Sequence, residues 1–210
     1  MLDEEDSENT RVRAQTRELT TRLLDAAVSA FSERGFEAAR VADIARRCKL
    51  TTGAIYSRWQ TKRDLFLDAV EYATTNTALV NVASSDMNIM DKFEVLGADH
   101  LSSIGDKFRS LVLEACVLAR RDETLKSQVS RALDTETQAY SALIEAAKAE
   151  GYVNAELDTQ CMLLCYQALN LGLELILSLE TRPERRPSLE DWRAVIASYM
   201  SGAYNASEDT

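Results

Sequence analysis

The segment VADIARRCKLTTGAIYSRW, residues 41–59, decides how this chain of 210 residues folds. Its apolar residues recur at helical spacing from position 41, which predicts a short helix over residues 41–48. A turn at residues 49–50 follows, and Thr51 is a suitable N-cap for a second short helix over residues 52–59. The segment therefore predicts two short helices that are joined by a tight turn.

Two such helices, packed on a longer preceding one, form a helix-turn-helix unit. The second helix of this unit is sized to enter the major groove of DNA, which is ~12 Å wide. Ile55 and Trp59 lie four residues apart, so we expect them to face inward, which leaves hydroxyl groups, a small glycine and basic residues outside. The predicted DNA-contacting residues are Arg40, Thr51, Thr52, Gly53, Ala54, Tyr56, Ser57, Arg58 and Lys62, with phosphate-binding charge added by Arg46, Arg47, Lys49 and Arg63.

Outward from this segment the chain reads as all-α. Proline is absent before Pro183 and glycine occurs only seven times, while good helix formers are abundant. No stretch alternates as a strand would, so we predict no sheet. The acidic start, residues 1–15, is predicted to be a disordered arm. The nine predicted helices are 16–34, 41–48, 52–59, 61–81, 88–103, 106–121, 123–150, 158–180 and 188–204.

The charge of the chain is distributed unevenly. The formal net charge is −10, yet residues 9–70 carry 12 Lys and Arg against 7 Asp and Glu, whereas residues 71–210 carry 12 against 22. Because salt screens charges beyond ~10 Å, the local field decides whether a surface attracts phosphates. A mildly basic module on an acidic body therefore remains compatible with DNA binding. Arg11, Arg13 and Arg17 are either a phosphate- or groove-contacting arm or a solvated helix start.

The sequence contains little that would indicate a catalytic or metal site. No nucleophile–base set, glycine-rich phosphate loop or spaced carboxylate pair stands out, so we expect no enzyme and no cofactor. Cys161 and Cys165 lie four residues apart, but with one His in the chain a metal site is hard to assemble, and ordinary buried cysteines are the preferred interpretation. No secretory segment begins the chain, which favours a cytoplasmic protein with free thiols.

Four short motifs stand out in the first third of the chain: Gly35-Phe36 and residues 41–45, 50–56 and 59–65. Together they resemble the tetracycline-repressor (TetR) family of bacterial regulators. The resemblance covers about residues 16–70 motif by motif, and the remainder only as a layout of helices. Lys49 stands where the family usually has a glycine, which predicts a positive φ there, and Arg40 stands at the usual capping Thr.

The resemblance implies a division of labour along the chain. Residues 16–62 would be the DNA-binding domain, with Tyr56 and Lys62 at the phosphates, and residues 63–210 an effector-binding and dimerisation domain. The helix at 61–81 would link the two and swing as a lever when a small molecule enters. The protein would then be a repressor that a small molecule releases from a palindromic operator. The alternative is a TetR-like helical protein that binds a protein partner or a ligand but no operator.

The effector and the dimer are expected in the helical remainder. The stretch 158–180 is strongly apolar, but Gln167, Asn170, Glu174 and Ser178 recur along one face, which argues against a membrane span and leaves solvent, a partner helix or a cavity as the surroundings of that face. We expect a homodimer through the helices at 158–180 and 188–204. A largely apolar small-molecule effector is expected, although each of its candidate contacts is equally compatible with plain core: Phe93, Leu96, His100, Phe108, Leu111, Tyr140, Tyr166 and Leu169.

Overall fold

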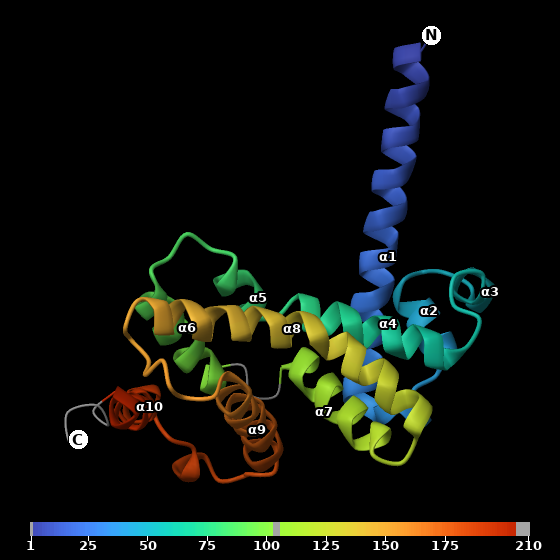
Figure 1. Cartoon of the computed structure of the whole chain (residues 1–210). Coiled ribbons are helices and arrows are strands. Elements are labelled where there is room, and N and C mark those ends of the chain that lie inside the picture. Colours follow the sequence, from blue (N-terminus) through green and yellow to red (C-terminus); the bar gives the residue numbers. More distant parts are fainter. Residues whose placement is uncertain (1, 103–105, 205–210) are drawn as a thin grey trace. The chain divides into compact units, whose positions relative to one another are not determined.

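A computed structural model describes residues 2–102 and 106–204, which form two compact units, Met1–Tyr72 and Ala73–Thr210. Every regular element in these ranges is helical, so the all-α prediction is confirmed for the part of the chain that the structure describes (Figure 1). The first unit contains α1 (Leu2–Ala38), α2 (Val41–Arg47) and α3 (Thr52–Tyr56), and α4 (Lys62–Thr75) begins in it.

Helix α1 begins far earlier than the sequence predicted. Residues 2–15, expected to be a disordered arm, are helical. The correction has a physical reason, because acidic residues at 3–6 favour the positive end of a helix and few helix breakers follow them. The expected stop near Gly35 is present as a kink, since Gly35 has φ 73° and ψ 167°, a conformation that suits glycine.

The local structure of the first unit follows the predicted signals. The Thr51 hydroxyl accepts a hydrogen bond from the Ala54 amide at 3.2 Å and caps α3. Lys49 has the predicted positive φ, 58°, and Arg40 precedes α2 without a side-chain cap. The core that these helices share is fully buried and consists mainly of Leu23, Ala27, Phe31, Ile44, Ile55, Leu65 and Phe66.

The second unit contains one more helix than the sequence predicted. The helix expected over 61–81 stops at Thr75, and Thr77 caps a new helix by accepting a hydrogen bond from the Val80 amide at 3.4 Å. Threonine competes well as a cap and poorly inside a helix, which explains the break. The helices of this unit are α5 (Ala78–Ala83), α6 (Ile89–Ser102), α7 (Lys107–Ala119), α8 (Glu123–Ala149), α9 (Thr159–Ser178) and α10 (Leu189–Tyr204), with a 3₁₀ turn at Pro183–Arg185.

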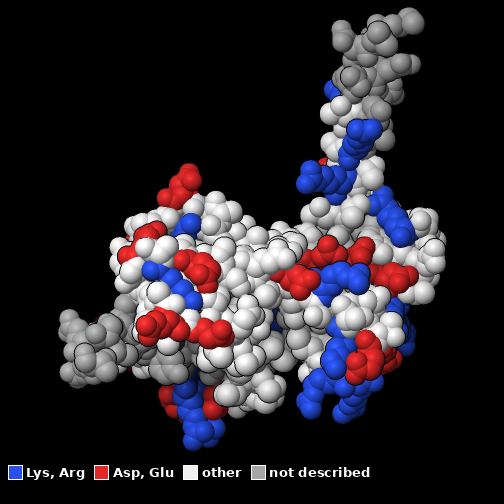
Figure 2. All heavy atoms as spheres, viewed as in Figure 1, with Lys and Arg blue, Asp and Glu red and all other residues white. Residues whose placement is uncertain are grey.

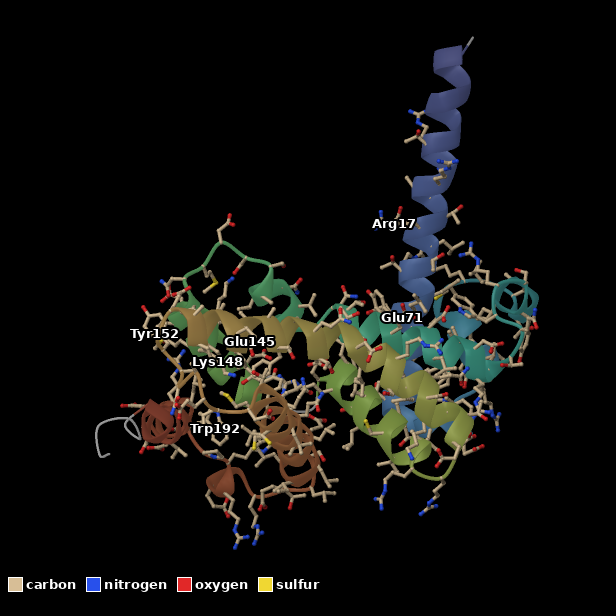
Figure 3. All side chains as sticks on the ribbon, viewed as in Figure 1. Arg17, Glu71, Glu145, Lys148, Tyr152 and Trp192 are labelled. Atoms are coloured by element: carbon tan, nitrogen blue, oxygen red, sulfur yellow. The ribbon has the colours of Figure 1, made fainter. Side chains whose placement is uncertain are left out.

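Two groups of helices pack in the second unit. One group joins α5, α6 and α8 around Leu79, Ile89 and Leu143. The other joins α7, α8 and α9, each of which contacts the other two. Hydrogen bonds also join helices of this unit. Trp192 of α10 donates to the Gly97 carbonyl of α6 at 3.0 Å, and Lys148 of α8 donates to the Thr159 hydroxyl of α9 at 2.6 Å; Figure 3 labels Trp192 and Lys148.

Helix α9 turns its most apolar side outward. Leu164, Ile176 and Leu179 are 66%, 65% and 73% exposed, and Cys161 and Cys165 are exposed as well. The expectation that these two cysteines are buried is therefore wrong for the single chain. By length and composition alone, α9 is the one helix among the described residues that is apolar enough to cross a membrane. It also carries the buried Glu174, 3% exposed, which would be costly in lipid.

Candidate nucleic-acid interface

Helix α3 is held to the first unit by two anchors. Ile55 is 1% exposed and Trp59 6%, and the Trp59 indole donates to the Asp68 carboxylate of α4 at 2.7 Å. Helix α4 is fixed in turn by a reciprocal cap, in which the Thr61 amide donates to Asp64 at 2.9 Å and the Asp64 amide to the Thr61 hydroxyl at 3.1 Å. The burial of Ile55 and Trp59 confirms that both side chains face inward, but the helix predicted over 52–59 ends at Tyr56, so Trp59 lies beyond α3.

The opposite side of α3 faces solvent. Thr51, Thr52, Gly53, Tyr56, Ser57 and Arg58 are exposed and Ala54 is partly buried. A Cβ added at Gly53 would meet a single neighbour, the Thr51 hydroxyl at 3.8 Å, and Gly53 does not have a positive φ. The fold itself therefore does not require a glycine at position 53. The close approach of another molecule to the backbone would require one.

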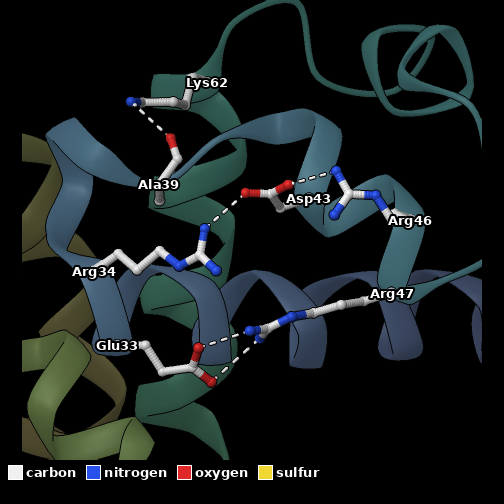
Figure 4. A network of polar contacts seen from close by, with 7 residues as sticks. All are labelled: Glu33, Arg34, Ala39, Asp43, Arg46, Arg47 and Lys62. Carbon is white, nitrogen blue, oxygen red and sulfur yellow. Dashed lines mark hydrogen bonds and ion pairs between the residues drawn. The ribbon is translucent and has the colours of Figure 1, made fainter.

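Several basic side chains around α3 already have internal partners. The Asp43 carboxylate receives hydrogen bonds from Arg34 and Arg46, both at 2.7 Å, and Arg47 forms a two-bond ion pair with Glu33, the shorter bond being 2.6 Å (Figure 4). The hydrogen bond from Arg47 lowers the pKa of Glu33 below its usual value. These pairs reduce the charge that Arg46 and Arg47 offer to phosphates.

Lys62 and Arg58 also bind within the unit. The Lys62 ammonium donates to the Glu37 and Ala39 carbonyls at 3.1 and 3.2 Å and lies 4.6 Å from the centre of the Phe36 ring. Arg58 donates to the Thr20 hydroxyl of α1 at 2.5 Å. Lys62 thus links the start of α4 to the C-terminal end of α1 and the residue after it. The sequence did not predict this structural role.

The cations that remain for a partner lie along the unit's surface. Arg40 and Lys49 are exposed, and no ion pair joins either side chain to the residues that the structure describes. Arg11, Arg13 and Arg17 are exposed along α1, where Figure 3 labels Arg17 and Figure 2 shows basic side chains following the helix. Elsewhere on the face drawn in Figure 2, acidic and basic side chains are interleaved.

The predicted effector residues do not share one environment. Leu96 and Leu111 are buried, whereas Phe93 and Phe108 are partly buried and Leu169 is 37% exposed. The rings of Tyr140 and Tyr166 stack with centroids 3.6 Å apart. The side chain of His100 lies outside the described residues.

A cavity of about 470 Å³ lies elsewhere, in the first unit, and contains none of the predicted effector residues. Its lining is formed by Thr21, Arg22, Asp25, Ala26, Ser29, Arg47, Cys48 and Tyr72.

Comparisons with known proteins match part of the first unit by sequence and most of the chain by fold. Residues 23–69 match the model of the bacterial regulatory proteins of the tetR family. A Rhodococcus protein classed as a TetR-family transcriptional regulator has 19% identity and a TM-score of 0.74, over 90% of this chain and 99% of its own. No curated protein sequence matches the chain significantly.

Two solved structures of ligand complexes have a similar fold. The regulator FadR of Bacillus subtilis, in complex with stearoyl-CoA, has 15% identity and a TM-score of 0.65, over 85% of this chain and 96% of its own. A regulator of Saccharomonospora viridis, in complex with choline, has 19% identity and a TM-score of 0.66, over 90% and 96%. At these identities the similarity shows a shared fold.

Proposed function

We propose that this chain, whose residues 23–69 match the model of the bacterial regulatory proteins of the tetR family, is a cytoplasmic, dimeric repressor released from its operator by a small molecule. The observation that carries the DNA-binding part is the exposed face of α3. Its backbone is anchored by Ile55 and Trp59, while Gly53 leaves open space that the fold does not use. A rigid helix with an open outer face is what major-groove reading requires.

The proposed contacts divide into two kinds. Thr52, Gly53, Ala54 and Ser57 would approach base edges, which specify the sequence, while Tyr56 and the surrounding cations would approach phosphates, which position the helix. Tyr56 suits this role because it is 47% exposed. Arg40 and Lys49 are better placed as phosphate contacts than Arg46 or Arg47, which would first have to leave their carboxylate partners.

The proposed dimer would form through α9 and α10. Leu175, Ile176 and Leu179 are 49%, 65% and 73% exposed, an apolar surface that a single chain leaves in water. Burying such a surface against the same helix of a second copy would be favourable by roughly 25 cal/mol per Å² of apolar area. A twofold dimer would also match a palindromic site, whose half-sites are about 34–36 Å apart.

The proposed effector would act through the second unit. Two proteins of the same fold hold stearoyl-CoA and choline, so the fold accommodates ligands of very different charge. We propose that residues 16–62 bind DNA, that residues 63–210 bind effector and partner, and that α4, Lys62–Thr75, couples them. An effector lowers operator affinity only if it binds one arrangement better than the other. The predicted lever is thus shorter than the 61–81 helix that the sequence indicated.

A binding experiment separates this proposal from the alternative, a TetR-like protein that binds a partner or ligand but no operator. Duplexes selected from random sequence by the full-length protein would be used in mobility shifts, with Thr52→Ala and Ser57→Ala as test variants. We expect enrichment of a palindrome and an altered base preference in each variant. Failure to enrich any sequence from the random pool would contradict operator binding and favour the alternative.

A further inference from the structure

The inward stripe of α8 contains one acidic residue. Its buried residues repeat every three or four positions, as expected for a helix with one face in a core. Glu136 lies on the same stripe, four residues after Ala132 and seven before Leu143, and is itself partly buried. The apolar members of the stripe are Leu125, Val129, Ala132, Leu143, Ile144 and Ala147.

The helices packed against this part of α8 are polar at the same place. Asn170 of α9 accepts a hydrogen bond from Arg109 of α7 at 2.9 Å, and Glu174 of α9 accepts one from Ser110 of α7 at 2.8 Å. Gln167 donates to Thr137 of α8 at 3.2 Å. The polar stripe of α9 therefore faces α7 and α8 while the apolar side of α9 faces outward.

Glu136 stands out in this polar group because its carboxylate has no bonded partner among the described residues. The charge of Arg109 acts on Glu136, but Arg109 donates its hydrogen bonds elsewhere, to Asp99 at 2.6 Å and to Asn170 at 2.9 Å. Burial raises the pKa of Glu136, which reports the same cost of placing a charge there. Among the described residues Gln128 Oε1 is the one fully buried oxygen without a partner, so the oxygens of Glu136 keep some contact with solvent.

Two tyrosine rings lie near this carboxylate, since the charge of Glu136 contributes to the raised pKa of Tyr166. Tyr140 lies one helical turn beyond Glu136 on α8 and stacks on Tyr166 of α9. Burial raises the pKa of both phenols, so they stay neutral at physiological pH. An acidic group beside neutral aromatic faces is a combination that attracts organic cations, through charge and through the quadrupole of the rings.

We propose that Glu136, with the Tyr140–Tyr166 pair, forms the recognition site for an organic cation of the alkylammonium class. The inference rests on the proposed function and adds a positive charge to the largely apolar effector that the sequence predicted. An anion is the poorer candidate, because it would lie beside Glu136 and because the charge of Arg109 is already paired with the Asp99 carboxylate. A cation instead supplies the partner that the Glu136 carboxylate lacks.

The test uses benzyltrimethylammonium as probe on the full-length protein, measured by calorimetry and by release of a selected duplex. The comparison ligands are its uncharged carbon analogue neopentylbenzene and the anion phenylacetate. The test variant is Glu136→Gln. Asp134→Asn is the matched control, because it removes an exposed carboxylate from the same helix. Of the three ligands, we expect only the cation to bind the protein and to release the duplex from it. The affinity of the protein for the cation should be roughly tenfold or more lower in Glu136→Gln and unchanged in Asp134→Asn.

Each other result overturns either the inference or the proposed function on which it rests. Equal affinity in wild type and Glu136→Gln would place the cation elsewhere, and tighter binding of phenylacetate would make Arg109 the recognition group. Absence of cation binding by a wild type that still binds the duplex would refute the cation site while leaving the proposed function intact. A wild type that binds the cation but no duplex would refute the proposed function instead. Thermal melting of Glu136→Gln, expected at or above the wild-type temperature, shows that lost binding is not lost folding.

Discussion

Replacing Gly53 by Ala separates what the fold needs from what a bound duplex needs. The added methyl carbon would have one neighbour, at the ordinary distance of 3.8 Å, and the backbone is not in the left-handed region. Alanine in place of glycine within a helix stabilises by up to about 1 kcal/mol, and by less in so short a helix as α3. The free protein should therefore melt at the same temperature or slightly higher.

Operator binding should change in the opposite direction. If the α3 backbone approaches the bases at Gly53, the methyl group must push the helix outward and disturb its neighbouring contacts. A loss comparable to one mismatched base pair, ~1–3 kcal/mol, corresponds to roughly 5- to 150-fold weaker binding. Fluorescence anisotropy with a duplex selected by the wild type would measure it at fixed salt.

A second variant controls for the added methyl group. Ser130→Thr also adds one methyl group at an exposed helical position, but on α8 in the second unit, and should bind the duplex like the wild type. Unchanged operator affinity in Gly53→Ala would refute the reasoning, because the methyl group would then point away from the DNA. A large loss of thermal stability in Gly53→Ala would refute the statement that the fold has room for a methyl group at position 53.

Three further changes test other parts of the account. Lys62→Met keeps an apolar side chain over Phe36 but removes two hydrogen bonds from a charged donor, so the free energy of unfolding measured in urea should fall by about 1–3 kcal/mol. An unchanged urea midpoint would contradict the structural role of Lys62. Leu175→Glu should give a folded monomer that no longer binds the operator, because Leu175 is already 49% exposed in the single chain, and a light-scattering mass of a dimer would exclude α9 from the interface. Burial raises the pKa of Glu136 in the folded state, so the stability that its protonation contributes is fully present below the unfolded value near 4.5 and is lost as pH rises through the folded value. Glu136→Gln should therefore raise the melting temperature at pH 8 but not at pH 4, and an equal effect at both would contradict the burial of this charge.

The sequence predicted the first unit well because its signals are local. Thr51 as a cap depends on residues within a few positions, and the positive φ of Lys49 was expected from the family resemblance of the same short segment. The break at Thr75–Thr77 was missed although its capping threonine is also local, since the apolar spacing continues through it and outweighed that single signal.

What the sequence could not predict depends on pairing across the fold. Arg46 and Arg47 looked like phosphate contacts, and nothing near them in sequence indicated that Arg47 would bind Glu33, fourteen residues away. The polar stripe of α9 was recognised, but whether it faced solvent, a partner or a cavity was left open, because a lone amphipathic helix does not define its surroundings. Contacts with α7 and α8 resolved this.

The central claim is that two copies of this chain read one duplex through α3. Sedimentation velocity of the full-length protein with a fluorescent duplex carrying the selected palindrome, at physiological salt, tests it directly. The account predicts one complex of two protomers on each duplex, and a Thr52→Ala variant that discriminates less between this duplex and one with a scrambled half-site. A wild-type protein that sediments apart from the duplex, or binds palindromic and scrambled duplexes equally well, would contradict it.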